Sequence, residues 1–198
     1  KNLFPETIDK ISNELTPMVA TARLIKQEHP DASVVFIGPC ASKKLEASRR
    51  TVRSDVDFVI TFEELTGMFE AKGILLDEIK AMDEMKDATA AGRGYGVAGG
   101  VANAIKECIE QYYPGTPVNI QHAESLAECK KALLLAKAGK MNGCLIEGMA
   151  CPGGCIAGAG TNIAIPVAAR AVDKFKNEAE KKVPDESVDQ EMVELEKE

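Results

Sequence analysis

The sequence predicts an α/β fold with two lobes, each built on a mainly parallel sheet flanked by helices. Two observations predict it: short apolar runs alternate with amphipathic stretches, and an apolar run followed by a cysteine occurs once in each half. A chain of 198 residues with 45% hydrophobic content is long enough to bury a core without disulfides. We therefore expect a functional site between the lobes, at the carboxyl ends of the strands.

Four apolar runs are predicted to be buried strands: SVVFIG (33–38), DFVIT (57–61), PVNIQ (117–121) and GCLIEG (143–148). Amphipathic patterns predict helices over residues 5–30, 62–73, 101–113, 123–139 and 161–182. Thr61 and Glu64 have the spacing of a capping box at the start of the second of these helices. Residues 183–198 are strongly charged and poor in aromatic residues, which predicts a charged tail or linker.

Charge and composition exclude several classes of partner. The net charge is -7, and the basic residues are scattered, so we expect no nucleic-acid partner. The longest apolar stretches, such as residues 132–136, are far shorter than the ~20 residues that span a bilayer, so we expect no membrane partner. Six cysteines without a secretory segment indicate a reducing, cytoplasmic compartment.

The six cysteines fall into two groups. Cys108, Cys129 and Cys144 lie inside the predicted helices and strand, where each is most simply a small buried hydrophobic residue. The other three follow predicted strands at turns rich in glycine and proline; they are Cys40, Cys151 and Cys155. Ordinary turn chemistry would explain the glycines and prolines of these segments but not their cysteines.

The spacing of these cysteines favours a metal group over a redox disulfide. Three residues separate Cys151 from Cys155, whereas thioredoxin-like pairs have two. On a helical turn the two side chains would share one face, and the glycines would let an inorganic group approach the backbone. Zinc remains open but needs a fourth ligand; neither His29 nor His122 lies in a motif, and His122 is expected to be a surface or hydrogen-bonded core residue. Three thiolates beside such turns favour an iron–sulfur cluster.

Two segments resemble signature motifs of the iron-only, FeFe-type hydrogenases. GPCASKKLEA (38–47) is similar to the second motif of that family, and EGMACPGGCIAGAG (147–160) is similar to the third. The connecting segments SDVDFVITFEEL (54–65) and GYGVAGGVANAIKE (94–107) also resemble the family, and the likeness covers about residues 3–170.

The resemblance implies an H-cluster, in which a 4Fe-4S unit is joined through one cysteine to a two-iron unit with carbon monoxide, cyanide and dithiolate ligands. By position, Cys40 and Cys151 would ligate the 4Fe-4S unit, and Cys155 would bridge it to the two-iron unit. Lys43 would donate to a cyanide ligand. The other implied cofactor-binding residues are Pro39, Glu46, which would brace the site by pairing with lysine or a backbone amide, and Met149, which would pack against the two-iron unit. Without the resemblance, residues 42–50 would be an ordinary solvated helix face, with Lys43 equivalent to Lys44.

The implied function is interconversion of hydrogen with protons and electrons in the intact protein, either as a catalyst or as a hydrogen or redox sensor of an anaerobe. The expected partners are an electron-transfer protein or a fused signalling module, together with cluster maturation proteins. One alternative is a cluster-binding protein of the same fold without hydrogenase activity, with an assembly or regulatory role. The other is a metal-free interaction domain.

Several positions depart from the family pattern. Gly38 stands where prototype enzymes have methionine, which would open one wall of the pocket, and residues 16–18 (TPM) replace a Ser-Pro-Gln stretch. With Thr161 after the third motif, these changes resemble the sensory branch of the family. The first motif, with the fourth cysteine, is missing, so residues 1–182 are expected to be a partial H-cluster domain. We expect this fragment alone to be inactive, to hold little iron when purified in air, and to have mobile or rearranged motif loops.

Overall fold

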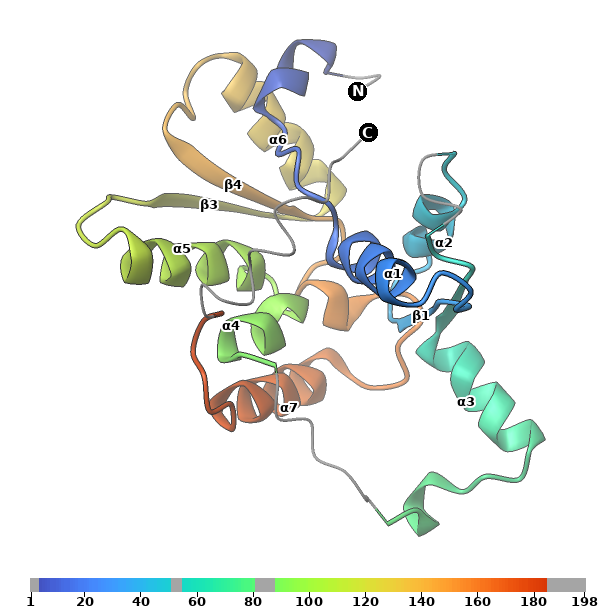
Figure 1. Ribbon diagram of the computed structural model, residues 1–198. Helices are drawn as coiled ribbons and strands as arrows, with labels where there is room; N and C mark the ends of the chain where they lie inside the picture. The colour runs from blue at the N-terminus through green and yellow to red at the C-terminus, as the bar shows by residue number, and fades with distance from the viewer. Residues whose placement is uncertain (1–3, 51–54, 81–87, 185–198) are drawn as a thin grey trace. The chain divides into compact units, whose positions relative to one another are not determined.

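The computed structural model describes residues 4–50, 55–80 and 88–184. These residues form two compact units, each with its own two-stranded parallel sheet (Figure 1). Unit 1 comprises residues 4–12, 88–157 and 163–184, and unit 2 comprises residues 13–50, 55–80 and 158–162. The predicted α/β class with parallel sheets is confirmed.

Unit 2 is built on strands β1 (Val35–Gly38) and β2 (Phe58–Thr61), which pair in parallel with Val35 opposite Phe58. Helix α1 (Pro17–Glu28) contributes most of the core of this unit. The buried core residues are Met18, Val19, Ala22 and Val56, and Phe36 and Val59 of the strands pack against them. One face of the sheet is therefore covered by α1.

The opposite face of this sheet is open. Side chains alternate between the two faces of a strand, so Val35, Ile37 and Phe58 point away from the α1 core. Their exposed fractions are 47%, 43% and 63%. The prediction that both strands are buried is therefore wrong for this face, because α1 covers only the face that carries Phe36 and Val59.

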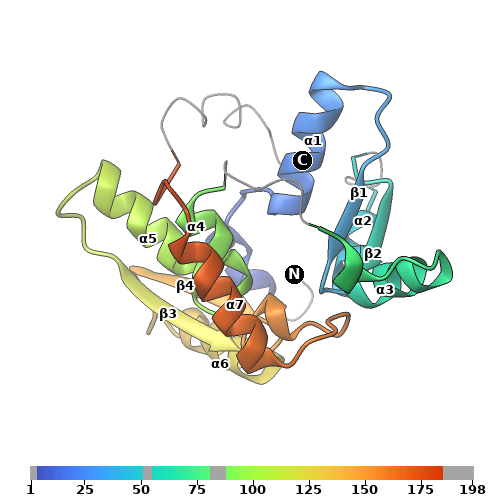
Figure 2. The same ribbon diagram turned by 90° about the horizontal axis from the view of Figure 1, so that it is seen from below.

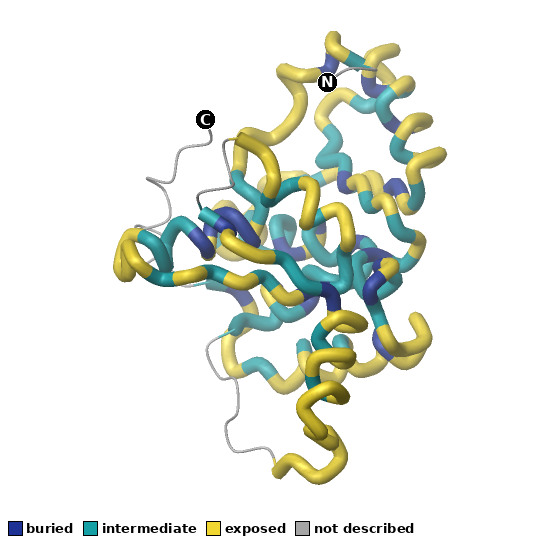
Figure 3. The backbone as a smooth tube through the Cα atoms, turned by 90° about the vertical axis from the view of Figure 1, so that its right-hand side faces the viewer, coloured by how far each residue is buried: buried dark blue, intermediate teal, exposed yellow. Residues whose placement is uncertain are grey.

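Two helices complete unit 2: α2 (Ser42–Ala47) and α3 (Phe62–Ala71), with a short 3-10 helix, η2 (Leu76–Glu78), after α3. The capping box of α3 is confirmed, since Glu64 N donates to Thr61 Oγ1 at 3.2 Å and Thr61 N donates to Glu64 Oε2 at 2.8 Å. In Figure 3 the lowest part of the tube, which is α3 with the segment after it, is exposed over nearly all its length.

Unit 1 is built on strands β3 (Asn119–Glu124) and β4 (Cys144–Met149), again in parallel. Helices α5 (Gly100–Tyr112) and α6 (Leu126–Lys137) cover opposite faces of this sheet (Figures 1 and 2). Both strands end at the same edge, so β4 delivers the segment after Met149 to the carboxyl end of the sheet.

The 3-10 helix η1 (Pro5–Lys10) of unit 1 contacts α6. Four further elements of unit 1 pack on the far side of α5 from the sheet. They are α4 (Ala90–Arg93), η3 (Gly94–Gly96), η4 (Cys155–Ala157) and α7 (Ile165–Asn177). The Arg93 guanidinium lies 4.2 Å from the centroid of the Phe175 ring, which links α4 to α7. Ala91, Ala104 and Val183 form a small buried cluster beneath them.

The predicted helix over residues 5–30 is wrong in its middle. The structure has a 3-10 helix, η1 (Pro5–Lys10), in unit 1 and then α1 from Pro17 in unit 2. Thr16 is extended, with φ -68° and ψ 151°, because a residue that precedes proline avoids the helical region, whereas proline suits the first helical position. The helix predicted over residues 161–182 runs only from Ile165 to Asn177. Of the predicted tail, residues 185–198 lie outside the described part of the chain.

Candidate functional site

The segment after β4, residues 151–155, is a tight turn and is called the cysteine turn below. Gly154 N donates to Cys151 O at 3.0 Å, with Pro152 second and Gly153 third in the turn, and Gly153 has φ +93°. Proline followed by a glycine of positive φ defines a type II turn. Gly154 also has a positive φ, +90°. The helical turn expected to place Cys151 and Cys155 on one face is therefore wrong, because two consecutive left-handed glycines interrupt it.

The cysteine turn lies directly against the glycine-rich segment 94–100, called the glycine turn below. Ala98 N donates to Gly153 O at 3.0 Å. A Cβ atom on Gly154 would lie 2.4 Å from Ala98 N and 2.8 Å from Gly96 O, so only glycine fits there. The sequence Pro-Gly-Gly therefore allows two backbone turns to pack without side chains between them.

Strand β3 holds the other side of the cysteine turn. Gly153 N donates to Glu124 Oε2 at 3.0 Å, and Ser125 N donates to Met149 O at 2.8 Å. Ser125 has φ 134° and ψ 160°, a backbone conformation that is almost confined to glycine. Sequence reasoning missed Glu124 and Ser125, because nothing in the pattern of an amphipathic helix start distinguishes them.

A buried carboxylate, Glu147, lies on β4 before the cysteine turn. Its Oε1 accepts hydrogen bonds from Val101 N at 3.0 Å and Ala102 N at 3.3 Å, at the start of α5. Its Oε2 is 3.2 Å from His122 Nδ1. His122 is therefore a half-exposed histidine with a carboxylate partner, as expected from the sequence. Glu147 itself was missed as a functional candidate.

Unit 2 contains the second motif, at the carboxyl end of β1. Cys40 Sγ is 2.9 Å from Ser42 Oγ. The tail of the third motif reaches this segment, since Gly160 N donates to Pro39 O at 3.0 Å. The ring of Phe36 fills the space beside Gly38, where an added Cβ would lie 2.6 Å from Phe36 Cε1. The expectation that Gly38 opens one wall of a cofactor pocket stays a prediction.

The two lysines of α2 have different surroundings. Lys43 Nζ is 2.6 Å from Glu46 Oε2, and Glu46 also accepts a hydrogen bond from Thr16 Oγ1. Lys44 forms an ion pair with Glu64, so it does not simply point to solvent. The exposed fraction of the side chain is 24% for Lys43 and 43% for Lys44. The pairing of Glu46 with lysine is thus present, while its role toward a cofactor stays a prediction.

The environment of Glu46 favours its ionised form. Burial by itself would raise the pKa of this carboxyl group. The hydrogen bonds from Lys43 and Thr16, together with the charges of Lys43 and Arg49, outweigh burial, so the pKa of Glu46 lies below its ordinary value. Glu46 therefore remains a charged partner that fixes the position of the Lys43 ammonium.

The predicted site residues divide between the two units. Unit 2 contains Pro39, Cys40, Lys43 and Glu46; unit 1 contains Met149, Cys151 and Cys155. Within neither unit do three histidine, cysteine, aspartate or glutamate side chains of the described residues gather as a metal-sized group. The ligand set of three cysteines, and its place between the lobes, stay predictions. The other three cysteines, expected to be buried, are only partly so.

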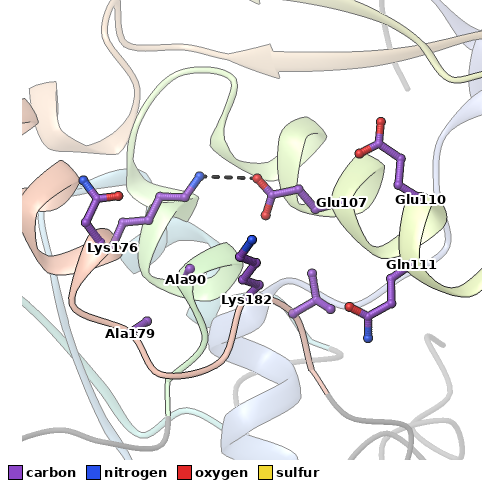
Figure 4. A pocket seen from close by; sticks show the side chains of 9 residues that line it. Ala90, Glu107, Glu110, Gln111, Lys176, Ala179 and Lys182 are labelled. Atoms are coloured by element: carbon purple, nitrogen blue, oxygen red, sulfur yellow. Dashed lines mark hydrogen bonds and ion pairs between the residues drawn. The ribbon is translucent and has the colours of Figure 1, made fainter.

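A cavity of about 450 Å³ lies elsewhere in unit 1, between α5 and the end of α7. Figure 4 shows the Lys176 side chain reaching Glu107, and the distance from Lys176 Nζ to Glu107 Oε1 is 3.4 Å. The other residues that line the cavity are Ala90, Glu110, Gln111, Asn177, Ala179, Lys182 and Val183. The cavity therefore includes none of the predicted site residues.

The fold is that of the FeFe-hydrogenases. The structure of HydA(deltaEFG), which concerns stepwise assembly of the H-cluster, matches with a TM-score of 0.68 and 21% identity over 96% of this chain and 66% of that chain. The apo FeFe-hydrogenase HydA1 from Chlamydomonas reinhardtii matches with a TM-score of 0.65 and 19% identity, over 98% of this chain and 66% of that chain. These likenesses concern the fold alone.

The family follows from the sequence. The family model "Iron only hydrogenase large subunit, C-terminal domain" matches residues 1–159, and the chain belongs to this family. The periplasmic Fe hydrogenase large subunit of Nitratidesulfovibrio vulgaris is 29% identical over 213 residues, which cover 86% of this chain and 50% of that protein. Iron hydrogenase 1 of Clostridium pasteurianum is 25% identical, covering 81% of this chain and 35% of that protein. The chain thus spans half or less of the length of these relatives.

A third relative is named as a cluster assembly factor and not as a hydrogenase. The cytosolic Fe-S cluster assembly factor NAR1 of Kluyveromyces lactis is 41% identical over 64 residues, which cover 32% of this chain and 14% of that protein. The predicted family is confirmed, while the sensory branch and the cytoplasmic location stay predictions. No helix of the described residues has the length and apolar character needed to cross a membrane.

Proposed function

We propose that in the intact protein this chain binds an H-cluster and takes part in interconverting hydrogen with protons and electrons, at a rate suited to catalysis or to sensing. The supporting observation is that the last residue of the third motif contacts the second motif within unit 2, where Gly160 N donates to Pro39 O beside Cys40, in a chain of this family. When bound, the H-cluster supplies the iron centres at which hydrogen reacts. The residues of the chain would hold the cluster through cysteine ligands and donate a hydrogen bond to it.

The proposed ligands are Cys40, Cys151 and Cys155. Thiolates suit iron–sulfur clusters, and each of these cysteines follows a parallel strand at a turn made by glycine and proline. Gly153 and Gly154 carry no side chains, so an inorganic group could approach the backbone of the cysteine turn. Pro39 and Met149 would supply apolar contacts, for which the flexible thioether of Met149 is well suited.

Lys43 is proposed as the donor to an anionic ligand of the two-iron unit. Its ammonium is a compact charge that forms strong hydrogen bonds with anions. Glu46 and Thr16 hold it from one side, through the Lys43–Glu46 ion pair and the bond from Thr16 to Glu46. An ammonium has three donors, so Lys43 retains capacity for a second acceptor.

A second candidate function is iron–sulfur cluster binding without the two-iron unit, in an assembly or regulatory role. The similarity to the assembly factor NAR1 favours it. The two candidates share the cysteine ligands but differ at Lys43, which has a cofactor role only when the two-iron unit is present. For either function we propose a cytoplasmic protein whose partners are cluster maturation proteins. A hydrogenase also needs an electron-transfer protein or a fused signalling module.

The test compares Lys43→Ala with Lys44→Ala in the intact, matured protein. Both lysines lie on α2 and pair with a glutamate, so they are matched in chemistry. Lys43→Ala should remove the infrared bands of carbon monoxide and cyanide, because an anionic ligand left without its donor costs about 2–5 kcal/mol. Lys44→Ala should keep these bands. Equal behaviour of the two variants would contradict the role of Lys43, and a matured wild type that holds iron without such bands would support the second candidate.

A further inference from the structure

Glu147 is the one charged side chain that is buried among the described residues, with 9% of the residue exposed. It interrupts the apolar run of β4, and burying a carboxylate is costly unless hydrogen bonds compensate. Both of its oxygen atoms have partners: Oε1 accepts from Val101 N and Ala102 N, and Oε2 contacts His122 Nδ1. The negative charge at the first turn of α5 is also favoured by the helix dipole.

These contacts tie the strand before the cysteine turn to the helix after the glycine turn. Glu147 bonds to the amides at the start of α5, which follow residue 100 directly. At the other end, Ala98 N donates to Gly153 O, and Gly154 packs against the backbone of residues 96–98. The two turns are thus joined once through the Glu147 carboxylate and once through their own backbones.

His122 closes the same arrangement from β3. Its ring lies against Gly99, where an added Cβ would be 3.2 Å from His122 Cε1, and Gly99 has φ +83°. The Gly99 conformation and the missing side chain let the imidazole reach Glu147 while it packs on the glycine turn. The side chain of His122 is 41% exposed, so its own removal opens no large buried cavity.

We propose that Glu147, with His122, is a positioning residue that holds the glycine turn against the cysteine turn and thereby fixes the placement of Cys151 and Cys155. The inference rests on the proposed function, in which these two cysteines are cluster ligands. Glu147 bonds to Val101 N, Ala102 N and His122 and acts through the backbone of the two turns. An ordinary buried side chain would hold the two turns by filling space, whereas Glu147 holds them through the hydrogen bonds of its carboxylate oxygens.

The metal-free chain provides the test through the alkylation rates of its cysteines, measured by mass spectrometry. Glu147→Gln keeps an oxygen that accepts from the α5 amides, whereas Glu147→Leu fills the space without any acceptor. We expect alkylation of Cys151 and Cys155 to rise about tenfold in the Leu variant and about twofold or less in the Gln variant, because unpaired buried amides favour local opening. Cys144, at the other end of β4, is the internal reference.

Two further variants keep the test decisive if Glu147→Leu fails to fold. His122→Ala removes one partner of Glu147 at a half-exposed position and should raise alkylation of Cys151 and Cys155 about threefold, relative to Cys144. Glu110→Gln makes the same chemical change as Glu147→Gln on the exposed side of α5 and should match the wild type. The proposal would be overturned if Cys151 and Cys155 were alkylated at equal rates in the Leu and Gln variants. It would also be overturned if His122→Ala did not raise their alkylation relative to Cys144.

A second measurement separates this inference from the proposed function. In the intact protein loaded without oxygen, iron should pass to a chelator faster in Glu147→Leu than in Glu147→Gln. A wild type that holds no cluster would refute the proposed function, whereas the alkylation rates of the metal-free chain would still decide the role of Glu147.

Discussion

Ser125 is a residue whose backbone conformation conflicts with its side chain. Its φ of 134° with ψ 160° lies in a region that is almost confined to glycine and costs other residues about 1–3 kcal/mol. Its hydroxyl compensates in part, because Ser125 Oγ accepts from Glu128 N at 3.2 Å and caps α6. The strain is stored beside the candidate site, since Ser125 N donates to Met149 O.

Two substitutions separate strain from capping. Ser125→Ala removes the cap and keeps the strain, whereas Ser125→Gly removes the hydroxyl and relieves the backbone. We expect the free energy of unfolding of Ser125→Gly to exceed that of Ser125→Ala by about 1–3 kcal/mol, measured by denaturant unfolding. Equal stability of the two variants would show that the backbone at this position is unstrained.

Glu46 makes the stability of the chain depend on pH. Its pKa in the folded chain lies below the ordinary value of 4.5, despite burial, because of its bonds to Lys43 and Thr16. The ionised carboxylate therefore stabilises the fold above that pH, and this contribution is lost as the pH falls below it, through the lowered pKa.

We expect the difference in thermal stability between the wild type and Glu46→Gln to be largest near neutral pH and to shrink as the pH falls below about 4.5. Lys43→Met, which removes one of the groups that lower the pKa of Glu46, should reduce the same dependence. A difference that stays constant from pH 7 to about 3 would contradict the assigned pKa direction.

At the scale of the elements, the contact between the glycine turn and the cysteine turn makes a prediction for Gly154. Gly143 also has a positive φ, +73°, but an added Cβ there would meet nothing within 4 Å. Gly143→Ala should therefore cost only the backbone penalty of about 1 kcal/mol. Gly154→Ala should cost at least about 2 kcal/mol more, because backbone atoms of residues 96–98 would have to move. Denaturant unfolding of both variants measures the difference, and equal losses would contradict the close packing of the two turns.

The helices, strands and turns show which features of the fold the sequence was sufficient to predict. The four strands, their parallel pairing and the capping box at Thr61 follow from apolar runs and local side-chain bonds, which are properties of short segments. The break before Pro17 could also have been predicted, since the residue before a proline avoids the helical region. The conformation of the cysteine turn could not be predicted, because the period of apolar residues says nothing about where a backbone takes a positive φ.

At the scale of the whole chain, local patterns predicted Cys40, Cys151 and Cys155 as ligands but gave no sign of the residues that hold the cysteine turn. Glu147 and Glu124 act on segments that are distant in sequence, through bonds to Val101 N and Gly153 N. Such long-range contacts leave no local signal. The open face of the unit 2 sheet was missed for the same reason, because an apolar run does not reveal which face another element covers.

The central proposal is that Cys40 and Cys151 are ligands of one iron–sulfur cluster in the intact protein. Iron per chain in the intact protein, prepared without oxygen, tests it most directly. We expect Cys40→Ala and Cys151→Ala each to lose most of the iron that the wild type holds, while Cys144→Ala, a change outside the two motifs, keeps it. Full retention of iron in either Cys40→Ala or Cys151→Ala would contradict the account.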